Sequence, residues 1–126
     1  MESAELLRKR RAARQQWYEL DDPPRRALLL RRPVRLLMST WSKGITAEMV
    51  PGIVEQCVVD WRGFTEADLL GAALASDDLQ PFDAAVFKDW SEDEPQIFNP
   101  VAERIFELIK QDFDTRSIAE KKPSPT

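Results

Sequence analysis

Residues 51–63 read PGIVEQCVVDWRG, and this stretch carries the best-defined apolar pattern in the sequence. Pro51 suits the first turn of a helix, where its missing N–H is not needed for an intrahelical hydrogen bond. The apolar residues that follow have the spacing of one helical face: Ile53, Val54, Cys57, Val58 and Trp61. Gly63 then supplies a C-terminal stop. We predict a helix over residues 52–61, with these apolar side chains in the core.

A second amphipathic stretch lies toward the end of the chain. Asn99-Pro100 combines an N-cap residue with a proline at the first helical position, which indicates a helix start. Apolar residues then step by four through Val101, Ile105, Ile109 and Phe113. We predict a helix over residues 100–112. The polar segment 114–126 has the composition of a disordered tail.

Three shorter helices are predicted between and before these two. Thr65 stands three residues before Asp68, a weak capping box that opens a helix through Leu70. Asp83 is an N-cap candidate for a helix that runs to about Trp90. Residues 34–42 also favour a short helix.

The N-terminal third of the chain combines a basic arm with a predicted β-hairpin. Residues 1–16 form a basic arm with helical propensity and a thin apolar face. Residues 17–33 predict two strands around the turn signal Asp21-Asp22-Pro23-Pro24. The three leucines 28–30 fit a helix as well, because short apolar runs are ambiguous. The predicted fold class is mainly α: one α-rich domain over residues 17–113 with an N-terminal β-hairpin.

Two residue types that support catalysis or metal binding are scarce. The chain has 126 residues, no histidine and one cysteine, Cys57. A Ser–His–Asp or Cys–His unit needs histidine, and zinc sites draw mainly on Cys and His. Cys57 lies on the apolar face and is expected to be buried and inert. The acids between Asp89 and Glu94 lack the spacing of a calcium loop, so a solvated turn explains them better. We expect no enzymatic activity, no metal and no cofactor.

Charge is distributed unevenly along the sequence. Residues 1–36 hold ten basic and five acidic side chains, and the rest holds eight basic and seventeen acidic ones. The net charges are therefore +5 and −9. Such a split can mean a basic arm that meets an acidic partner, but the halves of the chain could equally attract each other. A basic cluster at residues 8–11, with Arg14, could contact nucleic acid, but a solvated or partner-binding helix face explains it better. No apolar stretch reaches the roughly 20 residues that span a bilayer, and we expect a cytosolic protein.

Residues 45–71 read ITAEMVPGIVEQCVVDWRGFTEADLLG, and this run resembles the tail assembly chaperones of long-tailed, siphovirus-type bacteriophages and their prophages. Further landmarks of the family follow at Pro81-Phe82-Asp83 and at Glu94-Pro95. Upstream, a tryptophan-containing strand, a turn and a strand that ends at Arg32-Pro33 resemble the family's opening. The resemblance covers roughly residues 16–110, and the basic helical arm is longer than the family's start.

The resemblance implies an α-rich protein that acts in the bacterial host cytoplasm during virion assembly. Such chaperones keep the long, helical tape measure protein soluble and help to recruit tail tube subunits to it. In many phages, a frameshift makes a longer version with an added C-terminal domain. A homo-oligomer is compatible with this role.

A partner-binding surface is predicted between Trp17 and Trp41, where apolar residues and arginines alternate, as interfaces favour. The candidate contact residues are Trp17, Leu29, Arg31, Arg32 and Trp41. Leu29 and Trp41 are the candidate anchors, although each could be an ordinary core residue. The alternative function is a small nucleic-acid-binding regulator that uses the basic arm. A third is an inhibitor whose acidic half mimics nucleic acid.

Overall fold

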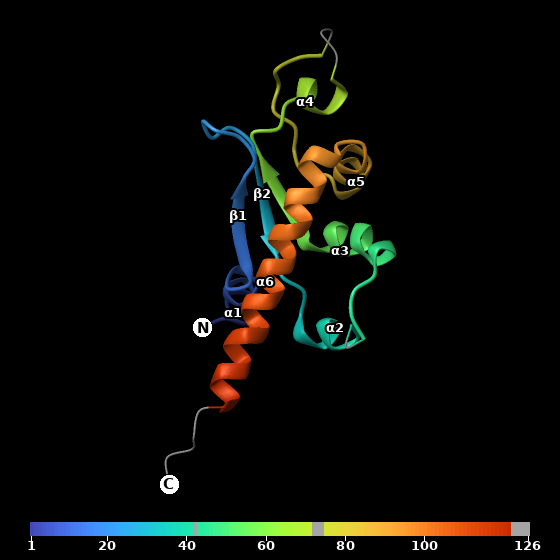
Figure 1. Ribbon diagram of the computed structural model, residues 1–126. Coiled ribbons are helices and arrows are strands. Elements are labelled where there is room, and N and C mark those ends of the chain that lie inside the picture. Colours follow the sequence, from blue (N-terminus) through green and yellow to red (C-terminus); the bar gives the residue numbers. More distant parts are fainter. Residues whose placement is uncertain (42, 72–74, 122–126) are drawn as a thin grey trace.

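The computed structural model describes residues 1–41, 43–71 and 75–121. Helices hold 55% of the chain, and a three-stranded antiparallel sheet accompanies them, so the fold is mixed α/β rather than mainly α with a hairpin alone. The elements of the described residues follow in this order (Figure 1): α1 (Ser3–Ala12), β1 (Gln15–Glu19), β2 (Ala27–Arg31), α2 (Arg35–Ser39), the 3₁₀ helix η1 (Ala47–Met49), α3 (Val50–Cys57), β3 (Val58–Arg62), α4 (Glu66–Leu70), α5 (Ala84–Glu92) and α6 (Pro95–Lys121).

The predicted hairpin is confirmed. Strands β1 and β2 pair antiparallel, with Trp17 opposite Leu29. The helical alternative for the three leucines is wrong, because alternation along β2 buries Leu28 and Leu30 on one sheet face. The connection is fastened by Asp21, whose carboxylate accepts hydrogen bonds from the Arg26 backbone N–H (2.9 Å) and the Arg26 Nε–H (3.0 Å).

The predicted helix over residues 52–61 is correct only in its first half. The helix α3 ends at Cys57, and Val58–Arg62 form strand β3 on the free edge of β2. Val58 and Trp61 are three residues apart, so a regular strand would place them on opposite faces. An irregularity in the register opposite Leu29 and Leu30 brings both to the core side. Because of this bulge, the buried residues Val58 and Trp61 of β3 have the same sequence spacing as residues on one face of a helix.

The last helix is longer at both ends than predicted. It begins at Pro95, and Pro100 lies inside it. The extra N-terminal turn carries Ile97 and Phe98, which pack against the core, and this apolar burial favours the earlier start. At the other end α6 runs to Lys121, so residues 114–121 of the predicted tail are helical. Residues 122–126 lie outside the described residues.

The short predicted helices are confirmed as α2, α4 and α5. The Thr65 hydroxyl accepts a hydrogen bond from the Asp68 backbone N–H (3.2 Å), and the Asp68 carboxylate accepts one from the Thr65 N–H (2.9 Å). Asp68 also binds the Arg25 guanidinium through two hydrogen bonds of 2.7 and 2.8 Å, which hold the pKa of its carboxyl well below the usual range. The cap of α4 therefore also fastens the hairpin turn.

Helices α3, α5 and α6 cover one face of the sheet, and the core lies between these layers. Trp61 stacks on Phe64 with ring centroids 4.6 Å apart, and Phe64 meets the Trp90 ring edge-on. Trp61, Ile105 and Cys57 are buried as predicted, and burial raises the pKa of the Cys57 thiol to about 12.

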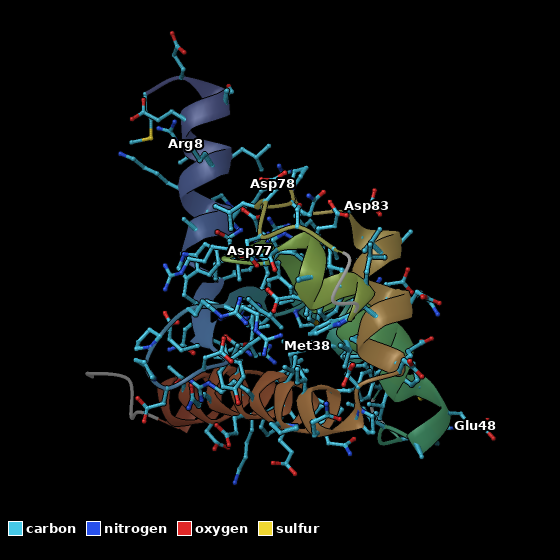
Figure 2. All side chains as sticks on the ribbon, turned by 90° about the horizontal axis from the view of Figure 1, so that it is seen from above. Arg8, Met38, Glu48, Asp77, Asp78 and Asp83 are labelled. Atoms are coloured by element: carbon cyan, nitrogen blue, oxygen red, sulfur yellow. The ribbon has the colours of Figure 1, made fainter. Side chains whose placement is uncertain are left out.

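The basic arm forms α1, but the helix ends at Ala12 rather than at residue 16, because Gln15 and Gln16 pair with β2 as part of β1. Helix α1 adds nothing to the core. None of its residues is buried. Figure 2 shows α1 projecting from the side of the molecule opposite α6, with Arg8 on the projecting helix. In the described residues, no helix is long and apolar enough to cross a membrane.

Candidate partner-binding groove

An open, largely apolar groove of about 820 Å³ separates α2 and the loop after it from the second half of α6. We call it the apolar groove. Met38, Trp41 and Ile45 come from α2 and the following loop. The opposite side is formed by α6, whose apolar contributions are Phe106, Ile109 and Phe113. Trp41 is half-buried and packs against the core, so the groove floor is continuous with the folded interior.

The groove arises because the apolar stripe of α6 is longer than the core. Ile105 is 1% exposed in the core, whereas Phe113, two turns later on the same stripe, is 60% exposed. Residues four apart share a helical face, so the side chains that anchor α6 lead directly into the groove. An exposed apolar surface of this kind marks an interaction site more often than a scattered leucine does.

The rim of the apolar groove is basic. Arg35, Lys110 and Arg116 line it, and among the described residues no acidic side chain does. The groove therefore combines an apolar floor with positive charge at its edge. This combination suits the apolar face of a helix that has acidic residues along its flank.

Three arginines, Arg32, Arg35 and Arg116, surround the carboxylate of Asp112 at the edge of the groove, and together with the neighbouring Arg14 we call them the arginine cluster. Arg35 donates two hydrogen bonds to the carboxylate, of 2.9 and 3.1 Å. Arg32 and Arg116 approach the same carboxylate to 3.5 and 3.6 Å. Burial is the main cause of the lowered pKa of Arg32, and the positive charge of the nearby Arg14 lowers that pKa further. The hydrogen bonds from Arg35 are the main cause of the lowered pKa of the Asp112 carboxyl.

The cluster has more donors than acceptors. The Nε atoms of Arg14 and Arg116 are buried and have no hydrogen-bond partner among the side chains that the structure describes, which in α6 end at Arg116. Arg14 and Arg32 also line a smaller polar pocket of about 290 Å³ between the start of β1 and α6. Because Asp112 lines that pocket while Arg35 and Arg116 line the apolar groove, the cluster borders both.

The predicted contact residues lie on two separate surfaces. Trp17 and Leu29 are cross-strand neighbours on the sheet face that points away from α6, since their neighbours Leu28 and Leu30 face the core. The Arg62 guanidinium lies over the Trp17 ring, 4.6 Å from its centroid.

Arg31 belongs to the Trp17 face by the same alternation, and its pKa is lowered by burial and by the neighbouring charges of Arg11 and Arg14. Arg32 joins the arginine cluster and Trp41 lines the apolar groove. The structure therefore brings Arg32 and Trp41 to one region and leaves the other three predicted contacts on the opposite sheet face.

The α6 side of the groove was missing from the predicted contact set. Ile109 and Phe113 were predicted only as members of the apolar stripe of the last helix. The available signal was Phe113, an aromatic residue that continues the stripe up to the boundary of a polar segment. Asp112 carried no such signal, because two of its three arginine partners, Arg32 and Arg35, come from a distant part of the sequence.

Among the described residues, no group of three or more Cys, Asp or Glu side chains is placed to hold a metal ion. No family model, no curated protein and no solved structure matches this chain. A functional proposal therefore rests on the apolar groove, its charged rim and the resemblance of residues 45–71.

Proposed function

We propose that the protein is a tail assembly chaperone of a long-tailed bacteriophage or prophage, which binds the tape measure protein in the host cytoplasm and performs no catalysis. The observation that carries the proposal is the apolar groove, where the stripe of α6 extends beyond the core and faces Trp41. The resemblance of residues 45–71 to such chaperones supports the same function from the sequence side.

The chemistry of the groove fits a long helical partner. An amphipathic helix can lay its apolar face in a groove between helices and bury side chains that would otherwise aggregate. Phe113 and Ile109 would lose their remaining contact with water in such a complex. Many copies bound along one tape measure protein would each need only modest affinity, because sites on one chain act together.

The proposal predicts that co-expression with the tape measure protein of the same phage genome raises that protein's solubility. Size-exclusion chromatography with light scattering should show a complex with several copies of this chain per partner. Phe113→Glu should weaken binding by at least about ten-fold, because it brings a charge into an apolar contact. Leu79→Glu is the matched control, since Leu79 is 71% exposed and lies outside the groove.

The same experiment can reject the proposal. Failure of the wild-type chain to bind the tape measure protein in mild salt would contradict it. Equal weakening by Phe113→Glu and Leu79→Glu would keep the function and remove the groove from it.

The alternative, a nucleic-acid-binding regulator, is favoured by one observation: α1 projects from the body with four consecutive basic residues, Arg8 to Arg11, all of them exposed. Binding to phosphates would weaken steeply as salt rises. Clear, salt-sensitive binding to duplex DNA without binding to the tape measure protein would favour this alternative over the chaperone.

A further inference from the structure

The arginine cluster carries an excess of positive charge that the fold itself does not need. Three guanidinium groups, those of Arg32, Arg35 and Arg116, share the carboxylate of Asp112, and the charge of Arg14 lies close to Arg32. Among the side chains that the structure describes, which in α6 end at Arg116, no second carboxylate pairs with these three arginines. Like charges at this spacing repel each other, and each buried donor without an acceptor costs free energy. A second acceptor placed here would relieve both penalties.

The position of the cluster indicates where this acceptor comes from. Arg35 and Arg116 line the apolar groove, and Arg14 and Arg32 line the polar pocket next to it. A helix that lies in the groove would have one flank alongside the cluster. The acceptor would then be a side chain of the partner, located beside its apolar stripe.

We propose that the arginine cluster binds a carboxylate of the helical partner, so that the groove selects amphipathic helices with Glu or Asp at the edge of the apolar stripe. This inference rests on the proposed function and adds the chemistry of the segment that the chaperone recognises. Arginine donors form planar, often bidentate hydrogen bonds with carboxylates, which makes such a contact both specific and strong.

A protein carboxylate fits this location better than a nucleic-acid phosphate. The cluster adjoins an apolar floor formed by Trp41, Phe106 and Phe113, which a DNA backbone would leave exposed. The exposed cations of α1 are the better candidates for phosphates, and α1 projects from the side opposite α6.

The test uses the full chain and three synthetic helical peptides of about 18 residues, or about five turns. All three carry the same leucine stripe, flanked by Glu in the first peptide, by Gln in the second and by Lys in the third. Isothermal titration calorimetry should show the Glu peptide binding about ten-fold more tightly than the Gln peptide, as expected for charge-assisted hydrogen bonds. The Lys peptide should bind least well. The preference for Glu should shrink between about 50 and about 500 mM NaCl.

Variants then locate the effect. In the double variant Arg14→Gln/Arg35→Gln, the dissociation constants of the Glu peptide and the Gln peptide should lie within about three-fold of each other. Arg62→Gln is the matched control, because its side chain is 51% exposed, like the 52% of Arg35, but lies on the opposite sheet face. Should the double variant fail to fold, the inference is tested by the single variant Arg35→Gln, in which the preference for the Glu peptide should fall, and by the loss of this preference in the wild type as salt rises.

The outcomes separate the inference from the proposed function. Equal binding of the Glu and Gln peptides would overturn the inference and leave the groove as an apolar site. A Glu preference that survives the arginine substitutions would overturn it too. Binding of none of the peptides would overturn the groove as a helix site and the inference with it. A duplex DNA that binds the wild type and loses affinity in the double variant would assign the cluster to phosphate instead.

Discussion

Gly63 shows how a single residue joins the hairpin to the rest of the fold. Its φ is +75°, and a Cβ atom built on it would lie 2.0 Å from the Arg25 carbonyl oxygen. We predicted this glycine as a helix stop, whereas it permits the backbone after β3 to pass directly against the hairpin turn. The local sequence indicated a special role for this glycine. The contact that requires it, between the end of β3 and the backbone of Arg25, follows only from the pairing of β3 with the hairpin.

Substitution of Gly63 by alanine should lower the free energy of unfolding by more than about 2 kcal/mol, because it combines an unfavourable positive φ with a clash against rigid backbone. Gly52→Ala is the matched control, since a Cβ there meets nothing within 4 Å in α3. The control should gain about 0.5–1 kcal/mol from higher helix propensity. Urea denaturation measures both, and a Gly63→Ala protein as stable as the wild type would contradict the described contact.

At the scale of elements, the sequence was sufficient to predict helices whose caps are local. It was insufficient to predict a strand that depends on pairing with a strand far away in the sequence. The caps Thr65 and Asp83 located α4 and α5, because capping involves residues only three apart. Strand β3 was missed because its bulge mimics helical spacing and because its pairing partners in β2 lie 28 to 35 residues earlier in the sequence. The start of α6 was placed one turn late because Asn99-Pro100 has the local features of a cap.

Helix α1 is an element that the fold does not need. Deletion of residues 1–12 should change the melting temperature by a few degrees at most, since no side chain of α1 is buried. Binding of the tape measure protein should persist, and any affinity for DNA should fall. Ile105→Ala, in the centre of the core, should instead cost about 2–5 kcal/mol. A large loss of stability in the deleted protein, measured by thermal denaturation, would show that α1 is part of the folded unit.

For the whole molecule, the prediction of a mainly helical fold with a hairpin was correct in part, because β3 extends the hairpin to a three-stranded sheet and the fold is mixed α/β. The candidate site was also predicted only in part. Trp41 and Arg32 lie in or beside the apolar groove, as an interface would require. Trp17, Leu29 and Arg31 were grouped with them because they are close in sequence. Strand alternation separates them, since it points neighbouring residues to opposite sheet faces. Residues of α6 complete the groove, and only tertiary packing brings them there.

The four tryptophans offer a direct test of whether a helical partner occupies the apolar groove. Each indole N–H gives one signal in a ¹H–¹⁵N spectrum, and the four report on distinct places. Trp41 lines the groove, Trp17 lies on the far sheet face, and Trp61 and Trp90 donate to the carbonyl oxygens of Gln80 (2.8 Å) and Asp68 (3.1 Å). On titration with a soluble helical fragment of the tape measure protein, the Trp41 signal should shift or broaden while the other three stay in place. A Trp17 signal that moves while Trp41 remains unchanged would contradict the account and place the partner on the opposite face of the sheet.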